Sequence, residues 1–256
     1  MARHGRKARL FLGPYMPTKR SRLVTGLLCL VVVLLALHDA RFWIKRQLPA
    51  PVLPPAPFGS SPAFREQAPL QELYGTTGGR IAMLGTSLTY RADWNALLHR
   101  CDVLNRGIPG DVTEGMLYRL PPLLADSSLR ICFIEGGGND LPQGLPLPRI
   151  LANLHQLADT FIHRGVHAVL ITTPYCSPVQ ANYRWINYRI AFLNAGLRYW
   201  APKWGVPLLD LNMLLSGTAE SLDPGFANEG DGVHLTAPAF ALWSQAVNQM
   251  LSRMDI

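Results

Sequence analysis

The chain has 256 residues, of which 24 are Lys or Arg and 17 are Asp or Glu, and its formal net charge is +7. Hydrophobic residues make up 48% of the chain and charged residues 16%, a composition that excludes an intrinsically disordered protein. Residues 1–46 hold ten of the basic residues and one acid, so this stretch carries +9 and the rest of the chain −2. Charge placed in this way excludes a nucleic-acid-binding domain, which gathers Lys and Arg on its folded surface.

The first segment of the chain has the pattern of a membrane anchor. Residues 1–22 form a basic tail with seven Lys or Arg and no acid, and residues 23–37 are uncharged and strongly apolar. The apolar run extends through Trp43 and Ile44, so residues 23–44 are predicted to be a transmembrane signal anchor. The positive-inside rule then leaves the N-terminus in the cytoplasm of a single-pass inner-membrane protein and places the rest in the periplasm or an equivalent extracytoplasmic space. A cleaved signal peptide is the alternative interpretation.

A proline-rich linker is predicted over residues 45–64, and a single folded domain over residues 65–256. The four cysteines include no CxxC pair and no spacing suited to zinc, so we expect neither a metal nor a redox cofactor. The sequence leaves open whether a disulfide joins two of Cys101, Cys132 and Cys176.

Short apolar runs alternate with helical patterns along the folded domain. Strands are predicted at residues 80–84, 102–105, 129–135, 167–173 and 206–211. Helices are predicted through residues 94–98, from residue 113, and over residues 148–164, 183–203 and 237–253. Five alternations of this kind predict an α/β fold with a parallel sheet and helices on both faces, whose sites lie in the loops after the strands.

Polar residues with catalytic chemistry follow four of these strands. Ser87 follows the first strand, Gly107 the second and Asn139 the third, while Asp231 and His234 follow the fifth and precede the last helix. Each of these residues, taken alone, is common in ordinary turns and helix caps. Their joint occurrence at the ends of different strands favours a site built around a serine nucleophile.

Each residue of this site has a predicted task. Ser87 attacks an acyl carbon, and His234 takes the hydroxyl proton as general base. Asp231 accepts the other ring N–H of His234, which fixes the tautomer, and stabilises the imidazolium as it forms. The backbone N–H groups of Ser87 and Gly107 and the side-chain amide of Asn139 are predicted to form the oxyanion hole.

The sequence resembles the GDSL or SGNH hydrolases, named for the Ser, Gly, Asn and His that stand here as Ser87, Gly107, Asn139 and His234. The resemblance covers residues 80 to about 250 and rests on the motifs NRGIPGD, GGGND and DGVHLTAPAFALW. It is closest to the platelet-activating-factor acetylhydrolase-like and lysophospholipase L1-like esterases. It implies a flavodoxin-like three-layer α/β/α sandwich with a doubly wound five-stranded sheet, no cofactor, and hydrolysis of ester-linked acyl groups. The family's first block is usually Gly-Asp-Ser-Leu, so Thr86 stands here in place of a carboxylate, and we expect the serine turn to be braced differently.

The sequence thus predicts a membrane-anchored serine esterase that removes small acyl groups, acetyl above all, from a glycan or lipid. One alternative is an O-acetyltransferase of cell-surface polysaccharide that uses the same serine, and another is a catalytically silent subunit of an envelope complex. The aromatic residues Tyr183, Trp185 and Tyr188 are predicted either to line an acyl or sugar site or to pack their own helix on the sheet.

Overall fold

The computed structural model describes residues 61–256, apart from residues 76–77, 126–127 and 218–219. All of these belong to one compact unit of the chain. The predicted tail and anchor lie outside the described residues, as does the linker before residue 61. In the part of the chain that is described, no helix combines the length and the apolar character needed to cross a bilayer.

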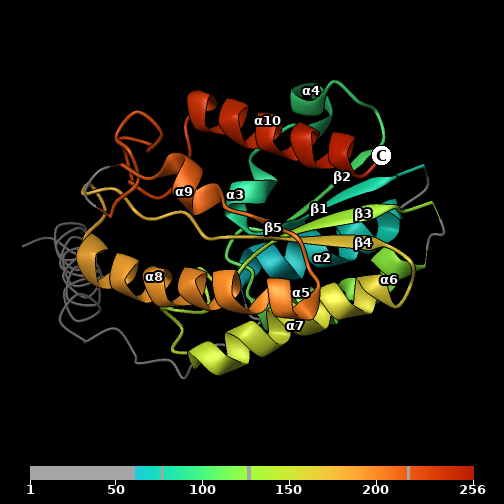
Figure 1. The fold of residues 1–256 in the computed structure, drawn as a ribbon, viewed down its shortest axis with the longest axis horizontal. Helices are drawn as coiled ribbons and strands as arrows, with labels where there is room; N and C mark the ends of the chain where they lie inside the picture. The colour runs from blue at the N-terminus through green and yellow to red at the C-terminus, as the bar shows by residue number, and fades with distance from the viewer. Residues whose placement is uncertain (1–60, 76–77, 126–127, 218–219) are drawn as a thin grey trace, which may run out of the picture. The chain divides into compact units, whose positions relative to one another are not determined.

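A five-stranded parallel sheet forms the centre of the fold (Figure 1). Its strands are β1 (Ile81–Gly85), β2 (Val103–Gly107), β3 (Ile131–Glu135), β4 (His167–Ile171) and β5 (Leu208–Leu209), and they lie in the order β2-β1-β3-β4-β5. β1, the first strand in the chain, pairs with β2 on one side and with β3 on the other. This is the doubly wound arrangement, and the sequence prediction of an α/β fold is confirmed.

Alternation along the strands supplies two separate cores. In β1, Ala82 and Leu84 join one buried cluster, whereas Ile81 and Met83 join the other. Successive side chains of a strand point to opposite faces, so both faces of the sheet are covered. A strand buried on both faces reads as a continuous apolar run, which is why the sequence revealed β1, β3 and β4.

Helices cover the two faces in separate groups (Figure 1). One face packs against α5 (Thr113–Tyr118), α6 (Leu120–Leu124), α7 (Leu147–Ile162) and α8 (Tyr183–Trp200). The other face packs against α3 (Ser87–Tyr90), α4 (Trp94–Leu98), α9 (Leu211–Leu215) and α10 (Ala237–Arg253). The three-layer sandwich predicted from the family resemblance is therefore confirmed.

Several elements differ in detail from the prediction. β2 runs on to Gly107, two residues beyond the predicted strand end, and β5 is only two residues long. The helix predicted from residue 113 divides into α5 and α6, because the second and third residues of α6 are prolines, which lack the N–H needed to continue α5. Helices α2 (Pro62–Tyr74) and α9 were not predicted, and α2 begins inside the predicted linker.

The three cysteines in the described part of the chain are free thiols, which answers the disulfide question left open by the sequence.

Two tryptophans join α4 to α10 beside the sheet. Trp94 and Trp243 are almost fully buried, and their rings meet edge to face with centroids 4.9 Å apart. The indole N–H of Trp94 donates to the carbonyl of Thr89 at 2.9 Å, at the C-terminal end of α3. The indole N–H of Trp243 has no acceptor among the described residues. The two rings therefore fill similar space, but only one of them makes a hydrogen bond.

We predict that Trp94→Phe lowers the free energy of unfolding by about 1 kcal/mol more than Trp243→Phe, because only the first change removes a buried hydrogen bond. Urea denaturation of the two full-length variants, followed by fluorescence, measures the difference. Equal losses, or a larger loss for Trp243→Phe, would contradict this interpretation of the pair.

Candidate active site

The candidate site lies where the chain leaves β1 and β3, at the carboxyl ends of the strands. Loops after β1 lead toward β2, and the chain then returns to the other side of β1 to form β3. Such a reversal opens a crevice at the sheet edge, because the two connections run in opposite directions. Ser87 is the first residue of α3, two residues beyond the end of β1.

The structure brings Ser87, His234 and Asp231 into one chain of hydrogen bonds. The Nε2 atom of His234 lies 3.0 Å from the Oγ atom of Ser87, although 147 residues separate them in the sequence. The Nδ1 atom of the same imidazole lies 2.6 Å from Oδ2 of Asp231. A hydroxyl, an imidazole and a carboxylate in this order can move a proton from the hydroxyl to the ring while the carboxylate stabilises the resulting charge.

Backbone groups of its own loop fix the carboxylate of Asp231. Oδ1 accepts the N–H groups of Val233 at 2.8 Å and of His234 at 2.9 Å. Partial burial acts to raise the pKa of Asp231, but the backbone N–H and imidazole of His234, with the N–H of Val233, lower this pKa to about 2. The carboxylate is therefore ionised throughout the pH range in which a histidine can act as a base.

Backbone hydrogen bonds from the loop after β4 and from its own loop hold the segment that carries His234. The carbonyl of Gly232 accepts the N–H of Ser177 at 2.7 Å, and the carbonyl of His234 accepts the N–H of Asn228, also at 2.7 Å. Gly232 has a φ of +67°, and a Cβ atom there would collide with Ser177 and Gln180. Only glycine suits this combination of backbone angle and crowding.

Asn139 faces the same site from the loop after β3. It lines one cavity together with Ser87, and its Nδ2 atom donates to the carbonyl of Asp111 at 2.9 Å. A side-chain amide has two N–H donors, so this bond orients the amide and leaves the second hydrogen for another acceptor.

Gly107 does not offer a free donor to the site, contrary to the sequence prediction. It is the last residue of β2, its N–H donates to Oδ1 of Asn105 at 2.9 Å, and its carbonyl accepts from Gln71 at 3.0 Å. A Cβ atom at this position would overlap the backbone of Tyr90. Gly107 is thus required for the close packing of β2 on α3. The prediction placed it in a loop because β2 extends two residues further than expected.

The next glycine along this loop is better placed. Residues Ile108 to Asp111 form a tight turn in which the N–H of Asp111 donates to the carbonyl of Ile108 at 3.1 Å. Gly110 has a φ of +75°, as the third residue of a type II turn requires, and is exposed. The N–H of Ile108 donates to Gly85 and the carbonyl of Asp111 accepts from Asn139, so the turn lies between the serine loop and Asn139. The Pro-Gly-Asp sequence of a type II turn is the signal that could have pointed to Gly110 instead of Gly107.

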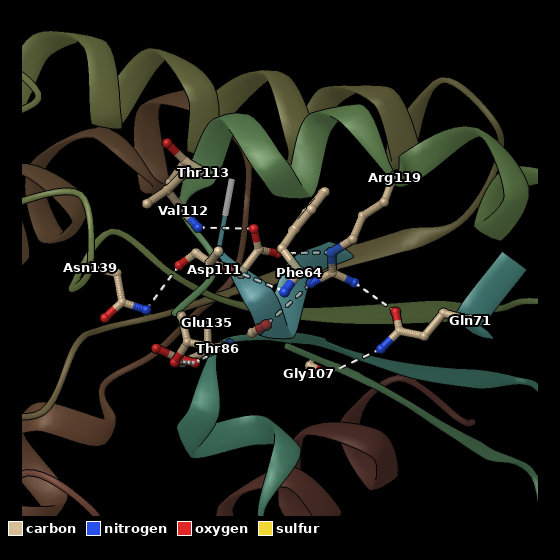
Figure 2. Close-up of polar contacts among 12 residues, drawn as sticks. Phe64, Gln71, Thr86, Gly107, Asp111, Val112, Thr113, Arg119, Glu135 and Asn139 are labelled. Atoms are coloured by element: carbon tan, nitrogen blue, oxygen red, sulfur yellow. Dashed lines mark hydrogen bonds and ion pairs between the residues drawn. The ribbon is translucent and has the colours of Figure 1, made fainter. Parts of the chain in front are cut away.

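A buried carboxylate braces the serine turn (Figure 2). Oε2 of Glu135, at the end of β3, accepts the backbone N–H of Thr86 at 2.9 Å, its hydroxyl at 2.8 Å and the hydroxyl of Thr89 at 3.3 Å. Burial raises the pKa of Glu135, while the hydrogen bonds from Thr86 and Thr89 act to lower it. Thr86 thus supplies two neutral donors to an acidic group, and a carboxylate at position 86 would instead meet a second carboxylate.

A buried ion pair supports the other side of the same turn (Figure 2). The Nε atom of Arg119 lies 2.8 Å from Oδ2 of Asp111, and Nη2 donates to the carbonyl of Gly85 at 3.2 Å. Burial raises the pKa of Asp111 to about 6, although Arg119 acts to lower it. Glu135, Asp111 and Arg119 were not predicted as supporting residues from the sequence. A lone acid that ends the apolar run of β3 was the signal for Glu135.

A cavity of about 290 Å³ opens beside Ser87. Its lining is mainly apolar and comes from the loops after β1, β3 and β4 and from the first turns of α8. Among the described residues, no group of three or more His, Cys, Asp or Glu side chains is arranged to hold a metal ion.

The chain matches known ester hydrolases in sequence. Residues 74–242 match the GDSL-like Lipase/Acylhydrolase family. Esterase TesA of Pseudomonas aeruginosa is 32% identical over 114 residues, which are 41% of this chain and 56% of that protein. The chain thus spans just over half the length of this curated relative.

Solved structures share the fold. The GDSL-like lipase of Bacteroides thetaiotaomicron superimposes with a TM-score of 0.63 at 17% identity, over 77% of this chain and all of that chain. The lipase/acylhydrolase of Enterococcus faecalis superimposes with a TM-score of 0.58 at 21% identity, over 69% of this chain and 96% of that chain. At these identities the likeness concerns the fold.

We predict that Thr86→Val lowers the free energy of unfolding by about 1–3 kcal/mol, because it removes a hydroxyl donor from a buried carboxylate while keeping the shape of the side chain. Thr86→Ser, which keeps the hydroxyl, serves as the matched control and should lose much less. Urea denaturation of the full-length variants measures both values. A Thr86→Val variant as stable as the wild type would mean that the hydroxyl does not support Glu135.

Proposed function

The chain belongs to the GDSL-like lipase/acylhydrolase family, a family of carboxylic ester hydrolases, and we propose that it is a serine esterase with Ser87 as its nucleophile. The observation that carries the proposal is the continuous contact from Ser87 through His234 to Asp231, with separations of 3.0 Å and 2.6 Å. These are the distances that direct proton transfer requires.

In the proposed mechanism, Oγ of Ser87 attacks the acyl carbon while its proton passes to Nε2 of His234. Asp231, ionised and fixed by two backbone N–H groups, stabilises the imidazolium. The imidazolium then gives its proton to the departing alcohol, and the acyl group remains on Ser87 as an ester. A water molecule, deprotonated by His234, attacks this ester, releases the carboxylic acid and restores the hydroxyl.

Three donors are proposed to stabilise the negative oxygen of the tetrahedral intermediate. Ser87 is the first residue of α3, where a backbone N–H has no carbonyl partner within the helix. The free amide hydrogen of Asn139 is the second donor. The backbone N–H of Gly110, an exposed residue, is the third and replaces that of Gly107, which is already bonded to Asn105. One such donor is worth on the order of 3 kcal/mol in acyl transfer.

The proposed substrate is an acyl ester of a glycan or lipid. The cavity beside Ser87 has room for more than the two carbons of an acetyl group, since it holds about 290 Å³ and a water molecule needs only about 10–15 Å³ of such volume. We therefore widen the proposal from acetyl to short and medium acyl groups.

Residues 23–44 are proposed to anchor the enzyme in the inner membrane, with residues 1–22 in the cytoplasm and the esterase domain outside it. The support is the distribution of charge: seven basic residues and no acid precede the apolar run, and the rest of the chain is nearly neutral. This placement gives the site access to lipids and envelope glycans.

We predict that Ser87→Ala and His234→Ala each lower kcat for p-nitrophenyl acetate, butyrate or octanoate by at least about 10³-fold, and Asp231→Asn by about 10²- to 10⁴-fold. Steady-state rates of the full chain in detergent measure these losses. Ser252→Ala, an exposed serine of α10, is the matched control and should keep full activity. A Ser87→Ala variant that hydrolyses these esters at the wild-type rate would refute the assignment.

The proposed orientation predicts that alkaline phosphatase fused after Ile256 is active in cells, because that enzyme folds only in an oxidising compartment. A fusion that lacks residues 1–44 should be inactive. Phosphatase activity is measured in whole cells. The size of the fusion on a gel then distinguishes an intact anchor from a cleaved signal peptide. An inactive full-length fusion would contradict the proposed topology.

A further inference from the structure

One cation forms part of the wall of the Ser87 cavity. Arg189, in the second turn of α8, is half-buried and lines the cavity together with Ser87 and Asn139. Most of the other lining residues are apolar, such as Leu141 in the segment after β3 and Ile186 in α8. A charged side chain in such a wall has lost part of its hydration and needs partners that replace it.

The contacts of Arg189 leave most of its charge uncompensated. Its Nη1 atom donates to the carbonyl of Leu141, and its guanidinium lies over the ring of Trp185, 5.0 Å from the centroid. In the described part of the chain it makes no ion pair with a carboxylate, unlike Arg119 and Arg198. A guanidinium has five N–H donors, so several remain for a ligand.

The surroundings favour an anion. Among the described residues, Glu135 is the one Asp or Glu that lines the cavity, and its Oε2 atom accepts hydrogen bonds from Thr86 and Thr89. Burial raises the pKa of the Cys176 thiol to about 11, so this lining residue is neutral. Helix α8 itself contains three arginines and no Asp or Glu. Arg189 is therefore a cation in the wall of the cavity that pairs with no carboxylate of the described residues.

We propose that Arg189 is a specificity-determining residue that binds an anionic oxygen group, a carboxylate or a phosphate, carried by the ester substrate. The proposal rests on the proposed esterase function and narrows its substrate class. Arginine suits the task because its planar fork can donate two parallel hydrogen bonds to such a group. Trp185 supports the fork from one side, which limits the conformations that binding must select.

The test compares esters matched in shape but not in charge. Phenyl butyrate is the neutral probe, and 4-butyryloxybenzoate and 4-butyryloxyphenyl phosphate carry the anion on the alcohol part. A second pair carries the difference on the acyl part: p-nitrophenyl pentanoate is neutral, and p-nitrophenyl hydrogen glutarate ends in a carboxylate. We expect the wild type to prefer at least one anionic ester, and Arg189→Gln to lower kcat/KM for that ester by about 10- to 100-fold, as the loss of a charged hydrogen bond implies. Rates on neutral esters should change less than about twofold if only this contact is lost.

Two further variants separate charge from structure. Arg189→Lys keeps the charge and should recover part of the preference, and Arg184→Gln removes an exposed cation of α8 that does not line the cavity and should change nothing. An unchanged ratio of anionic to neutral rates in Arg189→Gln, or an equal loss on every ester, would overturn the proposal.

A binding measurement keeps this inference distinct from the esterase proposal. Calorimetry of the Ser87→Ala protein with 4-butyryloxybenzoate requires no turnover. Binding that is tighter than for phenyl butyrate, and that is lost in Ser87→Ala/Arg189→Gln, supports the inference even if every ester proves inert. Equal binding of the charged and neutral probes counts against it whatever the rates are.

Discussion

The contact on which the site depends is the hydrogen bonding of Thr86 to the buried carboxylate of Glu135. β1 and β3 are neighbours in the sheet, and the last residue of β3 reaches under the turn that follows β1. A backbone N–H and a hydroxyl of one residue donate to the same oxygen, which fixes the position of the peptide just before Ser87. The position of Ser87 thereby depends on a contact with the sheet as well as on its own turn.

This contact also explains how the chain manages without the aspartate that the family usually has beside its serine. Thr86 is buried, so an ionised residue at position 86 would lie against Glu135 with little hydration. Two adjacent carboxylates cannot both stay charged in such a place. Threonine avoids the conflict because its hydroxyl donates where an ionised carboxylate can only accept.

Much of the fold could be predicted from the sequence because buried parallel strands are continuous apolar runs. The same logic failed where an element lacked its own pattern. β5 has two residues, α2 buries little apart from Phe64, and the end of β2 contains Arg106, which reads as a loop residue. That last feature misplaced the strand end and led to the choice of Gly107, whose N–H is bonded to Asn105, as a predicted donor.

The structure joins Ser87, His234 and Asp231 by hydrogen bonds and places Asn139 on the same cavity as Ser87. These residues could be proposed from the sequence because each follows a recognisable strand or precedes a recognisable helix. The supporting pair Asp111 and Arg119 depends on tertiary contacts that no local pattern encodes.

The distance along the chain between Ser87 and His234 has a consequence for biogenesis. The hydroxyl lies just after β1, whereas the imidazole is carried by the loop before α10, whose Trp243 packs on Trp94. A nascent chain therefore has a nucleophile without a base until His234 has been synthesised and its loop has folded against Ser87. Competence for the proposed chemistry thus requires segments that lie far apart in the chain, and a chain that ends before His234 would lack the proposed base.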